Sequence, residues 1–169
     1  VLPGDVLIAT IVQNETDNDN GGLSDVTASG WTLIDGRLIR SNGTNNNDNA
    51  WYGTVLFRIA DGTEGNAFVF ALPNARADMA IGSVTAFSGV TVTQGVNADG
   101  TAGGPFDVDP GILNLANAVT ATANGVTTVS ANSAVVMIAM VNNDRTYSGW
   151  TSTSPGALNE LVDYNTTDI

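Results

Sequence analysis

The sequence predicts an all-β fold, an antiparallel β-sandwich of immunoglobulin-like or jelly-roll-like type with long polar loops. Three observations lead to this prediction. Short runs rich in β-branched and aromatic residues recur along the 169 residues. Turn-forming pairs, Asn-Gly or Asp-Gly, lie between several of them. No segment keeps a helical period of apolar residues for more than about two turns, and a chain of this length is expected to form one domain, residues 1–169.

Seven runs are expected to form the strands of this sandwich, because each combines apolar, β-branched and aromatic residues. In chain order they are residues 5–12, 31–35, 52–60, 67–72, 79–87, 118–123 and 134–141. The last run, AVVMIAMV, is apolar almost throughout. We therefore expect it to be a central strand that is covered on both faces.

The two ends of the chain share a pattern. GDVLIATIV, a polar loop and SGWTLID occur near the start, and NSAVVMIAMV, a polar loop and SGWTSTSPGALNELVD occur near the end. Trp31 and Trp150 follow glycine at equivalent places, so both are predicted to be core residues. Three predicted strands follow the first copy, whereas only YNTTDI follows the second. We therefore expect a fragment that lacks its final strands, which either continuing sequence or a neighbouring chain would supply.

The composition excludes several kinds of chemistry. Seventeen acidic residues face five arginines, the net charge is −12, and the chain has no Lys, His or Cys. This charge disfavours nucleic acid and membrane surfaces as partners. Without His or Cys the chain cannot form a catalytic triad or a thiolate or imidazole zinc site, so we expect it not to be an enzyme. Its 14 Asp and 19 Asn leave Ca²⁺ or Mg²⁺ as the metals to consider.

Two acidic segments are candidate calcium sites. In NETDNDNGG, residues 14–22, Asp17 and Asp19 alternate along the chain and offer the oxygen ligands that Ca²⁺ prefers. The alternative is a solvated hairpin tip whose Asn and Asp side chains cap their own turns. In PFDVDPG, Asp107 and Asp109 lie on one side of an extended segment. They could form a second calcium site, a glycosidase carboxylate pair or a structural edge segment.

A third candidate site lies in the polar stretch SNGTNNNDNAWY, residues 41–52. An aromatic ring at Trp51 or Tyr52 would cover a sugar ring, while Asn47 and Asp48 would bind its hydroxyl groups. The alternative is that Trp51 begins the next strand and packs inward. This stretch therefore indicates either a glycan-binding loop or the entry to a core strand.

One charged residue, Arg58, lies inside an otherwise apolar run, LFRIAD. We expect its side chain to pair with Asp61 or Glu64, or to extend to water. Its predicted role is in stability only.

Several segments, in their order along the chain, resemble those of a known family. PGDVLIA, GWTLID, YGTVLFRIADGTE, FVFAL, AIGSVTAFSGV, GGPFDVDPG, VTTVSANSAVVMIAM and SPGALNELVDYN together resemble a β-sandwich repeat module of large secreted, adhesin-like surface proteins of Bacteroidota-type bacteria. The resemblance covers nearly the whole chain, and FDVDPG and SPGALNEL are its more specific parts. It implies an extracellular, non-catalytic, repeated module on the bacterial cell surface.

Three functions are therefore considered, and we expect the first. The first is a structural or adhesive module of a secreted bacterial surface protein or extracellular fibre, with neighbouring copies or domains of the same protein as partners. The alternative is a carbohydrate-binding module that binds surface glycans through the 41–52 loop. A hydrolase fragment built on Asp107 and Asp109 is the third possibility.

Overall fold

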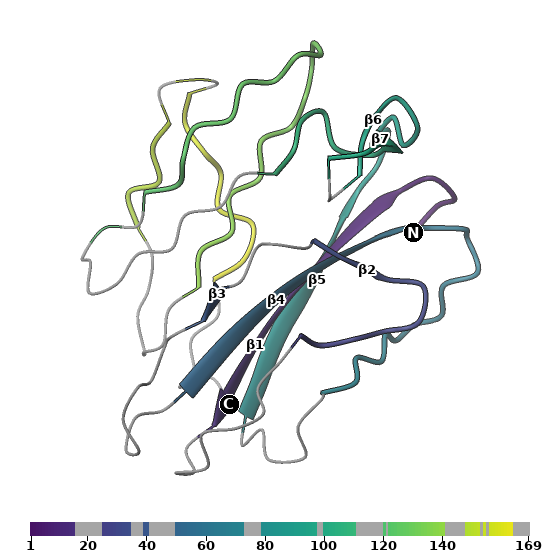
Figure 1. Cartoon of the computed structure of the whole chain (residues 1–169), viewed down its shortest axis with the longest axis vertical. Coiled ribbons are helices and arrows are strands. Elements are labelled where there is room, and N and C mark those ends of the chain that lie inside the picture. The colour runs from purple at the N-terminus through teal and green to yellow at the C-terminus, as the bar shows by residue number, and fades with distance from the viewer. Residues whose placement is uncertain are drawn as a thin grey trace.

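The computed structural model describes residues 1–15, 25–34, 39–40, 50–72, 79–97, 100–110, 120, 122–140, 148–152, 154 and 156–163. Within these ranges all regular structure is β-strand and every strand pairing is antiparallel, which confirms the predicted all-β class (Figure 1). The same ranges contain no helix long and apolar enough to cross a membrane. The strands are β1 (Val6–Glu15), β2 (Thr32–Leu33), β3 (Ile39–Arg40), β4 (Ala50–Ile59), β5 (Met79–Phe87), β6 (Gly95–Val96) and β7 (Ala102–Gly104).

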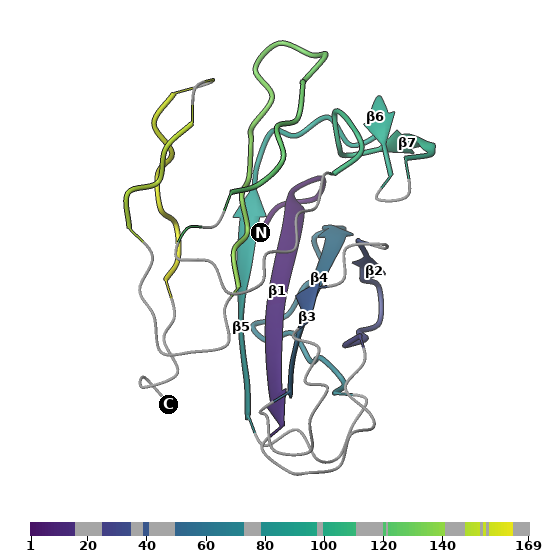
Figure 2. The same cartoon turned by 60° about the vertical axis from the view of Figure 1, so that its left-hand side comes forward.

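The main sheet has the strand order β2-β4-β1-β5, and β3 also pairs with β4. Its centre is β1, because Val6 lies opposite Ile59 on β4 and opposite Phe87 on β5, and both pairings continue along the strand. Figure 2 shows these strands side by side, with β5 at one margin. The short strands β6 and β7 form a separate two-stranded sheet.

One face of the main sheet carries the first of two small cores. Its buried residues are Ala9, Ile11, Val26 and Leu56, with Trp31 and Phe70 packed against them. The Trp31 ring meets the Phe68 ring edge-on at 5.5 Å between centroids, and the Phe70 ring at 5.2 Å. Two backbone hydrogen bonds between Thr27 and Ala71, of 3.2 and 2.8 Å, join the segments that carry these side chains. The segment before β2 and the segment after β4 therefore close over this face.

The opposite face carries the second core. Its buried residues are Ile34, Val55 and Phe57, and the half-buried Ile8, Phe106, Ile138 and Met140 pack against them. Phe57 and Phe106 meet edge-on, with 5.1 Å between ring centroids. The extended chain that carries Ile138 and Met140, residues 122–140, runs beside the sheet in Figure 2. The second half of the chain therefore contributes side chains to this face of the sheet.

Most strand predictions in the first half of the chain are confirmed. Residues 5–12, 52–60 and 79–87 correspond to β1, β4 and β5. The predicted strand at 31–35 is reduced to β2. Of residues 118–123, half lie outside the described residues, and the described ones, 120, 122 and 123, form no strand. The strands β3, β6 and β7 were not predicted, because two or three residues show no periodicity.

Two strand predictions are wrong. Residues 67–72 make only the isolated bridge at Ala71, and residues 134–140 make no β-ladder with any described residue. Val135 and Val136 are 37% and 43% exposed, so the expectation that this run is covered on both faces also fails. The physical reason is that apolar content favours burial of side chains, which Ile138 achieves by lying on the sheet without joining it.

Candidate functional site

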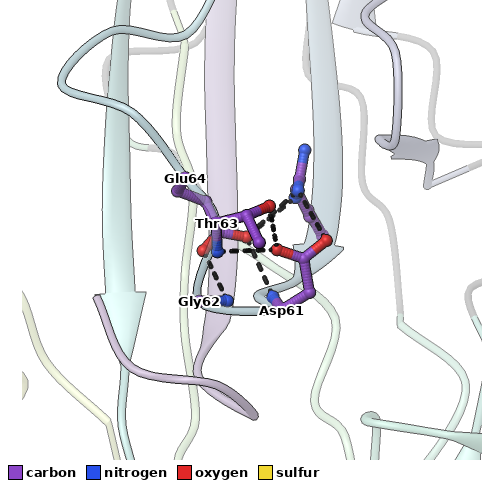
Figure 3. Close-up of polar contacts among 5 residues, drawn as sticks. Asp61, Gly62, Thr63 and Glu64 are labelled. Atoms are coloured by element: carbon purple, nitrogen blue, oxygen red, sulfur yellow. Dashed lines mark hydrogen bonds and ion pairs between the residues drawn. The ribbon is translucent and has the colours of Figure 1, made fainter.

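A polar cluster lies where β4 ends and the chain turns through residues 61–64 (Figure 3). Arg58 Nε donates a hydrogen bond of 3.2 Å to Glu64 Oε1. Its Nη2 atom lies 3.1 Å from the same oxygen and 3.4 Å from Asp61 Oδ2. The Glu64 side chain is only 3% exposed and the Asp61 side chain is 61% exposed, so Glu64 is the better shielded partner. The predicted pairing of Arg58 with these acids is confirmed.

The two carboxylates of this cluster also bind the backbone of the turn. Glu64 accepts hydrogen bonds of 2.9 Å from the N–H groups of Asp61 and Gly62. Asp61 accepts 2.8 Å and 2.5 Å bonds from the N–H and hydroxyl groups of Thr63. The Asp61 N–H is the main cause that lowers the pKa of Glu64, and the Thr63 hydroxyl is the main cause that lowers the pKa of Asp61. Both acids are therefore held ionised by groups of their own turn.

Two glycines beside this cluster show how closely it is packed. Gly30 has a φ of +77°, and a Cβ atom there would lie 2.9 Å from Arg58 Nη1. Gly62 has a φ of +85°, and a Cβ atom there would lie 2.6 Å from Pro3 Cγ. Both positions therefore need glycine for backbone conformation and for space. The Arg58 cluster thus joins β4, the 61–64 turn and the segment before Trp31.

Asp107, a predicted metal or catalytic residue, contacts a distant turn. Its Oδ2 accepts a 2.6 Å hydrogen bond from the N–H of Val129, and its Oδ1 accepts a 3.0 Å bond from the N–H of Ser130. Ser133 Oγ donates to the Ser130 carbonyl at 3.0 Å, and Asn132 between them has a φ of 64°. Bonding to the Ser130 side chain is the first cause that lowers the pKa of Asp107, and the Val129 N–H adds to it. Asp107 therefore anchors the 130–133 turn.

The other candidate metal ligands are not brought together in the part of the chain that the structure describes. Within the described ranges, no three Asp or Glu side chains gather in an arrangement that could hold a metal ion. The Asp109 carboxyl carbon lies 4.0 Å from where a Cβ atom of Gly100 would be. Asp17 and Asp19 lie outside the described residues, so calcium binding at that loop stays a prediction.

The predicted sugar-binding stretch is described only at its end. Asn47 and Asp48 lie outside the described residues, and Trp51 takes its place in β4 opposite Asn14. Tyr52 pairs with Gln13 and is 6% exposed. Its ring is therefore covered in this arrangement and cannot lie flat on a sugar, because the alternation of β4 turns it towards the core.

The contacts that can be predicted from the sequence are those between residues that lie close together in the chain. Asp61 and Glu64 lie three and six residues from Arg58, within reach of one long side chain. The partners of Asp107 are 22 and 23 residues away in the chain, so no local motif indicates them.

Comparisons with protein-family models, with curated proteins and with solved structures found no match to this chain.

Proposed function

We propose that this chain is a non-catalytic structural or adhesive module of a secreted bacterial cell-surface protein or extracellular fibre. The observation that carries the proposal is that carboxylates of this chain bind its own backbone N–H groups. Glu64 and Asp61 bind N–H groups of their own turn, and Asp107 binds N–H groups of the 130–133 turn. In a catalytic site such groups are directed at a substrate. Here they hold the backbone of the chain itself.

The composition and the resemblance support the same function. An acidic chain without Lys, His or Cys suits an extracellular protein that folds without disulfides. The resemblance to repeat modules of Bacteroidota-type surface proteins points to the same place. Secretion, display on the cell surface and a repeated arrangement are parts of this proposal.

The proposal extends to the finer architecture of the fold. The main sheet would be one layer of an immunoglobulin-like or jelly-roll-like sandwich, and the extended chain of residues 122–140 would belong to the second layer. The packing of Ile138 and Met140 on the core of Val55 and Phe57 supports this arrangement. Sandwiches bury the facing sides of two sheets in this way.

Neighbouring copies or domains of the same protein are the proposed partners. Apolar side chains in the second half are open to solvent, including Val129 at 79%, Leu161 at 65% and Val162 at 43%. Each of these side chains is a place where a neighbouring copy would remove apolar surface from water. A module in a series of copies would cover such residues with its neighbour.

The test is the location and role of the protein in the bacterium that carries the gene. An antibody raised against residues 1–169 should label intact cells, and protease added outside should remove the signal. An in-frame deletion of the coding segment should weaken attachment or fibre assembly while growth stays unchanged. Protein found only inside intact cells, or an enzymatic turnover lost on the change Asp107→Asn, would contradict the proposal.

A further inference from the structure

We propose that the edge of β5 that faces away from β1, with which no described residue pairs, binds the same edge of a second copy of this chain, so that one antiparallel sheet continues across both copies. The inference deepens the proposed function and rests on it, because it names one surface through which two neighbouring copies meet, separate from the exposed apolar side chains of the second half. It uses no group that the Arg58 cluster or Asp107 engages.

The first observation is the position of β5 in the sheet. Met79–Phe87 pairs with β1 over Val6–Asn14, and β5 is the last strand in the sheet order. Among the described residues, none makes a backbone hydrogen bond to the other edge of β5. A nine-residue strand therefore presents a row of N–H and C=O groups that another strand can pair with.

The second observation is that β5 lacks the features by which edge strands avoid pairing. Natural edges are kept apart by charged side chains, proline, bulges or very short strands. Met79–Phe87, MAIGSVTAF, has no charged residue and no proline, and its register with β1 runs unbroken. The opposite side of the sheet differs, because β2 and β3 are two residues long each. The β5 edge is thus the long, regular and uncharged one.

The uncharged, self-complementary edge of β5 favours a second copy as its occupant. A net charge of −12 opposes contact between two copies wherever their carboxylates meet. Antiparallel pairing of β5 with β5 places no charged side chain of one strand opposite another, so this repulsion is avoided along the contact. Such pairing is also self-complementary about a two-fold axis, as in most protein dimers. A strongly charged foreign strand would gain no ion pair from β5.

The side chains of β5 permit this approach. Residues with even numbers point to one face and are exposed, and they are small: Ala80, Gly82, Val84 and Ala86. Val84, at 38% exposure, is the large apolar residue among them. In the register that sets Val84 opposite Gly82 of a second β5, Val84 would contact a small residue and lie diagonal to the other copy's Val84, where cross-strand contacts stabilise antiparallel sheets.

The test is self-association measured by sedimentation equilibrium on the purified chain. The wild-type chain should form a dimer whose population rises with concentration. Val84→Lys should weaken that dimer by about tenfold, because it places two like charges at neighbouring positions of the paired strands. The direction is diagnostic, since adding Lys reduces the net negative charge and would strengthen any non-specific association. Val84→Glu should also weaken it, and mixing the two variants should restore a dimer of one copy of each.

The matched control is Val69→Lys, which makes the same change of charge at a side chain that is 84% exposed and lies outside β5, in the segment between β4 and β5. It should leave the dimer unchanged, and thermal melts should show that every variant is folded. A wild-type chain that stays monomeric at all concentrations would overturn the inference, and so would a Val84→Lys dimer as strong as the wild type. A surface-displayed but monomeric chain would overturn this inference alone. A dimer confined to the cell interior would overturn the proposed function instead.

Discussion

Replacement of Leu56 by alanine tests where the stability of this chain resides. Leu56 is 2% exposed and lies between Ala9 of β1 and Leu33 of β2 in the sheet register. It belongs to the first core, against which Trp31 packs. Removal of a buried leucine side chain loses its transfer free energy and leaves a cavity, which together cost about 2–5 kcal/mol. Because Leu56 is enclosed by two neighbouring strands, we expect a value within that range.

The control is the same substitution at Leu161, which is 65% exposed in the second half of the chain. We expect Leu161→Ala to change the free energy of unfolding by no more than about 0.5 kcal/mol. Urea unfolding followed by tryptophan fluorescence measures both, because Trp31 reports on the Leu56 core. The midpoint should fall for Leu56→Ala at an unchanged slope. Equal losses for the two variants would refute the placement of the core on the β1–β4 sheet.

Two further predictions concern the contacts of the second half. Ile138→Ala should lower the free energy of unfolding by about 1–2 kcal/mol, since Ile138 packs on the second core. In the same urea assay, Val136→Ala, at 43% exposure, should cost clearly less, and equal costs would refute the docking of this segment. Asp107→Asn should lower the melting temperature at neutral pH, because the anionic acceptor of the Val129 and Ser130 N–H groups is lost. The folded pKa of Asp107 is lowered, so its contribution is present above the unfolded pKa of about 3.9 and lost as pH falls through the folded value. Melting temperatures measured against pH should converge for variant and wild type in acid, and a constant gap would contradict the role of the charge.

The sequence pattern predicted the long strands of the main sheet because their side chains alternate or are buried on both faces. The strands β1 and β4 lie inside the sheet, and each buries residues on both sides, as Val55 and Leu56 do. The same apolar content at residues 134–140 predicted a strand that the structure does not contain. Burial of Ile138 and Met140 accounts for the pattern there without any backbone pairing. Apolar periodicity reports on side-chain burial, and strand pairing depends on partners elsewhere in the chain.

The candidate sites also differ in how far the sequence predicts their contacts. The contacts of Arg58 with Asp61 and Glu64 were predictable because all three lie within seven residues of chain. The role of Asp107 was not, because its partners Val129 and Ser130 come from a turn that only the tertiary fold brings near. An Asp-x-Asp pair is equally compatible with a metal site and with a backbone anchor. Three-dimensional neighbours are needed to distinguish them.

The most direct test of the central claim uses the absence of cysteine from the chain, which makes Val84→Cys its single thiol. Intact cells that carry this variant would be treated with a short bis-maleimide that does not cross membranes. If neighbouring copies on the cell surface are joined at β5, the Val84→Cys variant should give a cross-linked dimer. Val69→Cys, in an exposed loop, should react with a single maleimide but give much less dimer. A Val84→Cys chain that stays monomeric on cells whose Val69→Cys counterpart is labelled would contradict contact at β5. If neither variant is labelled until the cells are opened, the surface location itself is wrong.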